Sequence, residues 1–136
     1  MIDKISLAHG DGGELAYKLI QDLFVTTFDH HDHARLDAAI LSLPRNQIAV
    51  STDSFVIKPP FFPGGNIGKL AIAGTVNDIS VSGAEPLYIT VGFILEEGFS
   101  IKDLKEIVLS MANEAKKANV KIIAGDTKGV ERGSVD

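Results

Sequence analysis

Cysteine is absent from this sequence of 136 residues. Without a thiol, the chain can form no disulfide and no thiolate metal site, and it offers no cysteine nucleophile. That absence agrees with a reducing compartment, and we expect the protein to be cytoplasmic.

Long apolar runs and clustered positive charge are lacking as well. No stretch of about 18 apolar residues is present to span a bilayer, and residues 1–5 lack the apolar core of a signal peptide. The 13 Lys and Arg residues are scattered and are outnumbered by 18 Asp and Glu residues, which gives a formal net charge of -5. Since an acidic chain without a basic stripe attracts phosphate backbones poorly, we expect no nucleic acid and no membrane as a partner.

The residues that are present suit one ordinary domain. The hydrophobic content is 45%, and a chain of this length buries roughly two-thirds of its unfolded surface. No internal repeat or linker divides residues 1–136. Residues 130–136 show neither a helix cap nor a closing strand pattern, so we expect a second, C-terminal domain to follow in a longer protein.

The hydrophobic pattern of the first half predicts both helices and strands. Apolar residues recur at helical spacing over residues 13–28. Residues 38–43 and 47–52 read as two strands of a hairpin joined by a proline-containing turn. A stiff loop over residues 59–65, rich in Pro and Gly, leads into a helix that begins near Asn66.

The second half is predicted to form a strand, a helix and a strand. Residues 87–95 alternate but are apolar on both faces, which is typical of a strand that is covered on both sides. Ser100 and Asp103 form a capping pair at the start of a long amphipathic helix that Asn119 ends. Residues 120–124 then form a strand, so the chain mixes sheet and helix in the α+β class.

Two glycine clusters precede predicted helices. The backbone N–H groups of His9-Gly10-Asp11-Gly12-Gly13 could face an anion such as a triphosphate, or the segment could be a turn that caps the helix. Residues 64–70, GGNIGKL, differ from a P-loop because the glycines are one residue too close and Leu70 replaces the hydroxyl residue that holds magnesium. We interpret this second cluster as the entry to a tightly packed helix.

Four aspartates border apolar runs: Asp37, Asp53, Asp78 and Asp126. Carboxylate oxygens are the ligands that magnesium prefers, so the four together predict a cage for a magnesium ion that accompanies a nucleotide. Each aspartate could instead cap a helix or form a turn.

Other polar residues lie near these acids. Asn77 precedes Asp78, and Lys128, two residues after Asp126, could neutralise a phosphate or could be an ordinary solvated lysine. Residues 29–33 offer zinc-type side chains, but adjacent histidines rarely converge on one tetrahedral centre. We therefore interpret residues 29–33 as an exposed loop.

Five blocks of sequence, taken in order, resemble one family. They are HGDGG at 9–13, STDSFV at 51–56, FFPGGNIGKLAIAGTVNDISVSGAEP at 61–86, GFILEEG at 92–98 and GDTK at 125–128. Together they are similar to the N-terminal domain of the HypE family of hydrogenase maturation proteins, also called carbamoyl dehydratases. The likeness covers nearly all of the chain, and the central block is far more specific than a glycine motif.

The resemblance implies a fold and a role for each candidate residue. The family belongs with aminoimidazole ribonucleotide synthetase, selenophosphate synthetase and thiamine monophosphate kinase. It implies a mixed sheet with helices packed on one face, a sheet that pairs across a homodimer, and ATP with Mg²⁺ in a cleft near that interface. The implied roles are His9 and Lys128 in catalysis, Gly10, Gly12, Gly13, Asn77, Asp126 and Thr127 in nucleotide binding, and Asp37, Asp53, Asp78 and Asp126 at the metal.

The reaction that the resemblance implies is an ATP-dependent dehydration. A carbamoyl group on a C-terminal cysteine becomes a thiocyanate, the precursor of the cyanide ligands in [NiFe] hydrogenases. Phosphate leaves more readily than an amide oxygen, so phosphoryl transfer makes the elimination feasible. The implied partners are the carbamoyltransferase HypF, the HypC-HypD iron scaffold and the protein's own C-terminal domain, which would supply the cysteine that this chain lacks.

Two other interpretations remain open. The chain could belong to another ATP-using relative, such as a selenophosphate synthetase or a thiamine monophosphate kinase. His9 with its glycines, and the lack of a catalytic cysteine, speak against the selenophosphate synthetase. The chain could also be a non-catalytic dimerisation or interaction module, and the sequence leaves open whether it is an enzyme by itself.

Overall fold

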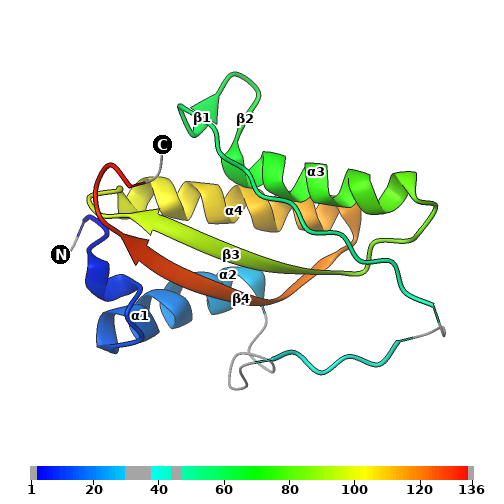
Figure 1. Cartoon of the computed structure of the whole chain (residues 1–136), viewed down its shortest axis with the longest axis horizontal. Helices are drawn as coiled ribbons and strands as arrows, with labels where there is room; N and C mark the ends of the chain where they lie inside the picture. Colours follow the sequence, from blue (N-terminus) through cyan, green and yellow to red (C-terminus); the bar gives the residue numbers. More distant parts are fainter. Residues whose placement is uncertain (1–2, 30–37, 44–46, 135–136) are drawn as a thin grey trace.

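The structure is a computed structural model, and it describes residues 3–29, 38–43 and 47–134. Helices and strands are mixed along the chain, and the predicted α+β class is confirmed. Figure 1 shows two strands lying between helices. The elements in order are η1 (Leu7–His9), α1 (Glu14–Leu19), η2 (Ile20–Val25), α2 (Thr26–Phe28), β1 (Phe61–Phe62), β2 (Gly65–Asn66), α3 (Ile67–Val81), β3 (Tyr88–Glu96), α4 (Ile101–Ala118) and β4 (Lys121–Val130).

Strands β3 and β4 pair in parallel (Figure 1). Their register starts with Tyr88 opposite Lys121, and a bulge in β4 leaves Ile123 without a partner. Parallel neighbours need a long crossover connection, and α4 provides it. The strand predicted at 120–124 continues to Val130, because its polar second half still pairs with β3.

Helix α4 is the long amphipathic helix that the sequence predicts. At its start the Ser100 hydroxyl oxygen accepts the Asp103 N–H at 3.2 Å, and Asn119 ends it with a left-handed φ of 57°. One apolar cluster joins α4 to α1, η2 and β3, and a second cluster joins it to α3 and β4. The buried members are Ile5, Leu19, Leu23, Phe24, Leu95, Leu104 and Val108 in the first cluster, and Ile72, Ile107, Met111, Ala115, Val120 and Ile122 in the second.

The helix predicted over residues 13–28 is confirmed as one continuous segment made of α1, η2 and α2. Its middle part, η2, is wound as a π-helix, and Asp29 follows its end with a left-handed φ of 53°. The Phe24 ring in η2 stacks on the Phe93 ring of β3 with 4.6 Å between centroids. This contact fixes the helical segment against the sheet.

The second glycine cluster enters α3 as a short hairpin. Strands β1 and β2 are antiparallel, and the Lys69 ammonium donates to the Gly64 carbonyl at 2.9 Å. The Asn66 side-chain oxygen accepts the N–H groups of Gly68 and Lys69, at 3.0 Å and 3.1 Å, and so caps the helix. Lys69 therefore supports its own loop, in agreement with our rejection of a P-loop.

Helices α3 and α4 pack closely because Gly68 lies at their contact. A Cβ at Gly68 would lie 2.5 Å from the Ile107 carbonyl oxygen of α4, so a larger residue does not fit without a shift. The small residues predicted for this helix thus serve close packing. Within the described ranges, neither of these helices nor any other is both long enough and apolar enough to cross a membrane.

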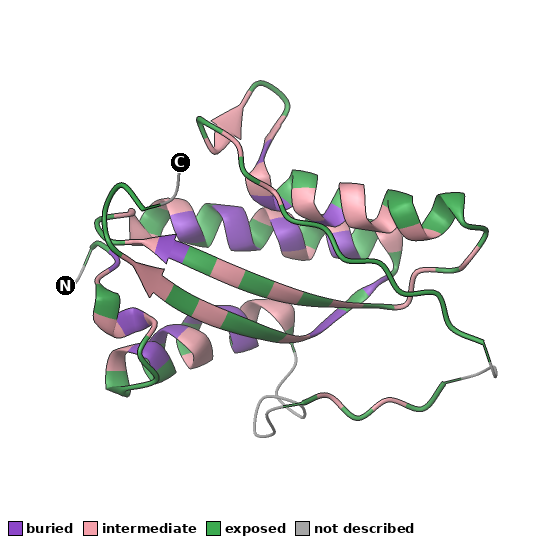
Figure 2. Ribbon diagram, in the orientation of Figure 1, coloured by how far each residue is buried: buried purple, intermediate pink, exposed green. Residues whose placement is uncertain are grey.

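One face of the β3–β4 sheet is open. Residues of β3 alternate between half-buried and exposed positions over most of the strand, and Figure 2 shows this alternation along β3. Ile94, on the open face, is 66% exposed, and Tyr88 is exposed as well. The prediction that this strand is covered on both sides is therefore not met within a single chain. Pairing of the sheet across a dimer agrees with the open face, although one chain does not show it.

The hairpin predicted at 38–43 and 47–52 is not formed by the described residues. Both segments are free of strand pairing, and the Val50 side chain is 82% exposed. The apolar alternation there is genuine, but a strand needs a partner backbone, and none lies beside these segments among the described residues. The prediction was wrong for this chain taken alone.

Candidate functional site

A cavity of about 560 Å³ lies beside β4, where distant parts of the sequence meet. Its walls are the loop after η1, the inward side of the helical segment from Glu14 to Phe28, and the middle of β4. Figure 1 shows η1 and α1 below the C-terminal half of β4. The lining residues are His9, Gly10, Asp11, Gly12, Ala16, Ile20, Phe24, Phe28, Val91, Phe93, Ile122, Ile123, Ala124, Gly125, Asp126, Thr127 and Lys128.

Two glycines allow the segment HGDGG at 9–13 to pack against the end of GDTK at 125–128. A Cβ at Gly10 would lie 2.0 Å from the backbone nitrogen of Gly129 and 2.7 Å from the carbonyl carbon of Lys128. A Cβ at Gly129 would in turn lie 3.0 Å from the Leu7 carbonyl oxygen. The segment HGDGG therefore lies directly against the end of GDTK, as a shared ligand site requires.

His9 is buried in this contact, with 4% of its surface exposed. Its Nδ1 atom lies 3.0 Å from the backbone nitrogen of Ser6 and 3.0 Å from the Ser6 hydroxyl oxygen. Because the Ser6 N–H can only donate, Nδ1 accepts. Sequence reasoning singled out His9 but missed Ser6, although the spacing of three residues across a helical turn was a usable signal.

The rest of the glycine loop forms a turn. The Asp11 carboxylate accepts the Gly13 N–H at 2.8 Å, and Gly12 has a left-handed φ of 80°. This arrangement is the turn that we weighed against the phosphate interpretation. The N–H of Gly13 has its acceptor in Asp11, so an anion would have to displace that carboxylate.

Asp126 and Lys128 form an ion pair on β4, with 3.1 Å between the carboxylate Oδ1 and the ammonium Nζ. Both side chains are mostly exposed, and Asp126 is opposite Gly92 on the open face of the sheet. An exposed pair of this kind contributes on the order of 1 kcal/mol or less. Lys128 can therefore exchange Asp126 for a phosphate at little cost. Thr127 lies between them and is half-buried.

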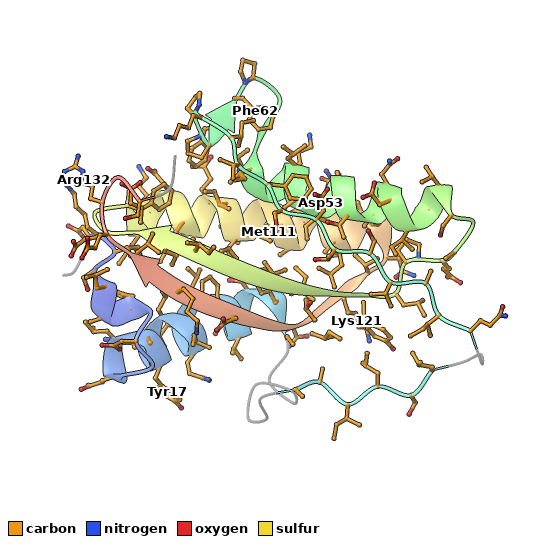
Figure 3. All side chains as sticks on the ribbon, in the orientation of Figure 1. Tyr17, Asp53, Phe62, Met111, Lys121 and Arg132 are labelled. Atoms are coloured by element: carbon orange, nitrogen blue, oxygen red, sulfur yellow. The ribbon has the colours of Figure 1, made fainter. Side chains whose placement is uncertain are left out.

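The other predicted acids lie on different elements. Asp53 lies on the extended segment that passes in front of α3 in Figure 3, and its carboxylate accepts the Ser54 N–H at 2.8 Å. Asn77 and Asp78 are exposed on α3, so Asp78 lies inside a helix instead of bordering a strand. Asp37 lies outside the described residues.

Phe55 brings the Asp53 segment onto α3. A Cβ at Gly74 would lie 2.8 Å from the Phe55 ring, so the ring packs directly on that glycine. Asp78 follows Gly74 by four residues, which is one helical turn on the same face. The contact thus places the segment of Asp53 one turn from Asp78, and neither Phe55 nor Gly74 was predicted for this role.

Over residues 3–29, 38–43 and 47–134, no three His, Cys, Asp or Glu side chains are grouped closely enough to hold a metal ion. The structure joins His9, Gly10 and Gly12 to Asp126, Thr127 and Lys128 around one cavity. Asp78 lies on α3, and the segment that carries Asp53 packs on the same helix through Phe55 and Gly74. The four-carboxylate cage stays a prediction, as do the roles of the individual residues. Residues 30–33 of the histidine-rich segment also lie outside the described part.

Comparison with known families gives the class of the protein. Residues 35–136 match the family model described as AIR synthase related protein, N-terminal domain. The match covers well over half of the chain, and the chain belongs to this family.

Within the family, several similar relatives are named carbamoyl dehydratase HypE. The chain is 52% identical over 141 residues to carbamoyl dehydratase HypE of Escherichia coli (strain K12), an alignment that covers 99% of this chain and 42% of the relative. It is 47% identical over 137 residues to the HypE protein of Rhodobacter capsulatus, with 98% of this chain and 40% of the relative covered. The chain therefore spans less than half the length of these relatives and resembles their N-terminal domain.

Solved structures agree with this assignment. The fold superposes with a TM-score of 0.91 on hydrogenase maturation protein HypE in complex with ATP, at 50% identity, covering 96% of this chain and 39% of that one. It also matches the HypE-HypF complex with a TM-score of 0.65 at 58% identity, covering 87% of this chain and 38% of that one. The predicted resemblance to the HypE N-terminal domain is confirmed.

Proposed function

We propose that this chain is the ATP-binding N-terminal part of a carbamoyl dehydratase that acts in hydrogenase maturation. The observation that carries the proposal is the contact of the His9–Gly12 loop with residues 125–129 of β4 around a cavity. A relative of known structure, 50% identical to this chain, was solved in complex with ATP. Backbone N–H groups near glycines, a lysine and a histidine are groups that bind phosphate oxygens.

The nucleotide would be held by both regions of the site. Gly10 and Gly12 line the cavity and would present backbone near its phosphates, Gly13 would join them once its N–H leaves Asp11, and Thr127 and Lys128 approach from β4. Lys128, released from Asp126, neutralises charge on the transferred phosphoryl group. Asn77 supplies a polar contact from α3.

Asp37, Asp53, Asp78 and Asp126 would hold Mg²⁺ jointly with the nucleotide, because Asp53, Asp78 and Asp126 are not grouped closely enough in the single chain to hold the ion alone. Their donor atoms are carboxylate oxygens, which fit this ion. When bound, Mg²⁺ supplies neutralisation of the charge on the phosphate oxygens. The described residues contribute Asp53 and Asp78 through the packing of Phe55 on α3, and Asp126 from β4.

The reaction proposed for the whole protein is a dehydration in two steps. The amide oxygen of an S-carbamoyl group attacks the γ-phosphorus of ATP and ADP leaves, while the amide nitrogen gives up one of its two protons to solvent, which leaves an O-phosphorylated imidate. Loss of phosphate and of the remaining N–H proton then gives the thiocyanate, with His9 and Lys128 as the catalytic groups at the phosphoryl end. Since this chain has no cysteine, the sulfur comes from a C-terminal domain, in accord with the 42% of the relative's length that the chain spans.

We further propose that two copies pair through the open face of the β3–β4 sheet and the exposed segments 38–43 and 47–52. Ile94 and Val50 are large apolar side chains left mostly exposed there. A solved relative forms a complex with HypF, and we extend that partner, together with the HypC-HypD scaffold, to the protein containing this chain.

Calorimetry with Mg²⁺-ATP on the 136-residue chain tests the site. We expect the chain to bind Mg²⁺-ATP. Asp53→Asn and Asp78→Asn should each weaken this binding by about tenfold, because each replaces a negatively charged ligand of the cation with a neutral amide. Glu114→Gln is the matched control, since Glu114 lies on α4 and pairs with Lys117 on the same helix. Equal affinity for Mg²⁺-ATP in the two aspartate variants and the wild type would show that Asp53 and Asp78 are not part of the site.

A second candidate function is a non-catalytic interaction module, which the open sheet face favours. The two candidates differ in one measurement. A chain that self-associates but binds no Mg²⁺-ATP, even at millimolar nucleotide, supports the module. ATP binding at the cavity supports the dehydratase.

A further inference from the structure

His9 is a polar side chain buried at the edge of the cavity with only one of its ring nitrogens occupied. The residue is buried, with 4% of its surface exposed. Nδ1 contacts Ser6, whereas Nε2 has no hydrogen-bond partner in the part of the chain that the structure describes. A buried imidazole nitrogen without a partner is costly unless a ligand completes it.

The contacts of Nδ1 decide where the ring proton lies. Three atoms of Ser6 are near Nδ1: the backbone nitrogen at 3.0 Å, the hydroxyl oxygen at 3.0 Å and the carbonyl oxygen at 3.3 Å. The hydroxyl can donate or accept, so its contact does not decide which ring nitrogen carries the proton. The carbonyl already accepts the His9 backbone N–H at 3.0 Å and is the most distant of the three.

The Ser6 backbone N–H is a fixed donor, and among the described residues its acceptor is Nδ1 of His9. A proton on Nδ1 would point at this N–H and would break the contact. The neutral ring therefore carries its proton on Nε2. A protonated, cationic ring would clash with the same donor.

From these contacts we propose that His9 is a neutral hydrogen-bond donor to an anionic oxygen of the ligand in the cavity. The Ser6 backbone N–H is the positioning group that fixes the proton on Nε2. His9 lines the same cavity as Gly12 and Lys128, so the oxygen belongs to a phosphate or to the O-phosphorylated imidate formed from it. The inference rests on the proposed nucleotide site and assigns His9 the part of a donor, not of a base.

The contacts of His9 argue against the role of a general base. A general base must have a free lone pair directed at the substrate. In His9 the lone pair lies on Nδ1 and is engaged by Ser6, while the N–H is on the side of the ring that has no partner among the described residues. The histidine can thus stabilise negative charge but cannot abstract a proton without losing the Ser6 contact.

Nitrogen-15 NMR of the histidine-labelled 136-residue chain tests the tautomer directly. Of the four histidines, His9 is assigned by the signal that His9→Gln removes. We expect the shifts of the Nε2–H tautomer without ligand, and a change at Nε2 much larger than at Nδ1 when Mg²⁺-ATP is added. Ser6→Ala keeps the backbone donor and should leave the tautomer unchanged.

Two amide variants separate the ring nitrogens. The glutamine amide of His9→Gln places an N–H near the position of Nε2, whereas the shorter amide of His9→Asn reaches only the position of Nδ1. We expect Gln to hold Mg²⁺-ATP within about threefold of the wild type, and Asn to lose about tenfold or more, since a hydrogen bond to a charged group is lost. If His9 served only to hold Ser6 through Nδ1, His9→Asn would bind Mg²⁺-ATP more tightly than His9→Gln.

The outcomes are distinguishable from failure of the proposed function. An Nδ1–H tautomer or a cationic ring at neutral pH overturns the inference without any ligand. Binding of Mg²⁺-ATP that leaves the Nε2 signal unchanged also overturns it, while the nucleotide site stands. Absence of ATP binding in the wild-type chain overturns the nucleotide site and with it the role of His9 as a donor to its phosphates.

Discussion

At the scale of single residues, the site depends on positions where no side chain fits. Gly10 and Gly129 let η1 lie against the end of β4, and this contact joins segments more than a hundred residues apart in the sequence. Gly74 likewise allows a close contact on α3, because the Phe55 ring occupies the space that a side chain would fill. The functional groups are thus placed by glycines that carry no chemistry of their own.

Gly10→Ala is expected to loosen the glycine loop. The added Cβ would lie 2.0 Å from backbone on β4, so the loop or the strand must move. We expect a loss of about 1–3 kcal/mol, typical of overpacking, and a fall in Tm of several degrees by thermal denaturation.

Gly92→Ala is the matched control, because a Cβ at Gly92 meets nothing within 4 Å in the single chain, and the variants are compared at a protein concentration where the chain is monomeric. Its Tm should stay within about 1 °C of the wild type, since a small side chain on an uncrowded strand changes stability little. Equal Tm values for Gly10→Ala and the wild type would contradict the close contact with β4.

At the scale of elements, α3 links stability to function. Its start packs on α4 through Gly68, and its middle supports the Asp53 segment through Gly74. The two glycines lie on one helix but face different neighbours: the Ile107 backbone at Gly68 and the Phe55 ring at Gly74. Their substitutions should therefore have different consequences.

Gly68→Ala is expected to destabilise the fold by about 1–3 kcal/mol, because a backbone carbonyl lies 2.5 Å from the new Cβ. Gly74→Ala should change the free energy of unfolding little, since alanine favours a helix by about 1 kcal/mol and the displaced Phe55 ring is mobile at its end. Denaturant titration measures both free energies.

Gly74→Ala should still weaken Mg²⁺-ATP binding, because the displaced ring moves the segment that carries Asp53. Calorimetry at a temperature where both variants are folded separates the two effects. Unchanged ATP affinity in Gly74→Ala would show that the position of this segment does not matter to the site.

At the scale of the whole molecule, the single chain leaves apolar surface exposed on one side. The helices cover one face of the β3–β4 sheet, and Ile94 and Tyr88 are exposed at alternate positions of β3 that belong to the other face. The segment 47–52 extends beside the domain without strand pairing. An open sheet face and unpaired extended segments are the features that association between copies would cover.

Ile94→Glu is expected to shift the chain toward the monomer in sedimentation velocity, because the substitution puts a charge into the proposed interface. Leu109→Glu is the matched control, since Leu109 is also largely exposed, at 54%, but lies on α4. A dimer that survives Ile94→Glu, or one that Leu109→Glu disrupts equally, would place the interface elsewhere.

The sequence predicted the elements whose signals are local. Ser100 and Asn119 marked the ends of α4, and apolar spacing located the helical segment from Glu14 to Phe28. The prediction of a hairpin from residues 38–43 and 47–52 was wrong, because apolar alternation does not indicate which backbone a strand pairs with. The end of β4 was placed too early, because its polar residues gave no sign that β3 would pair with them.

For the site, the sequence by itself determined the chemistry: the histidine and glycines of one motif, the Asp-Thr-Lys of another, and the acids between them. Only the tertiary structure decided which of these meet. It joined His9 to β4 through Gly10, set Asp53 near α3 through Phe55, and directed the His9 ring through Ser6. The physical reason is that residue type fixes what a group can bind, whereas its neighbours depend on steric fit between segments distant along the chain.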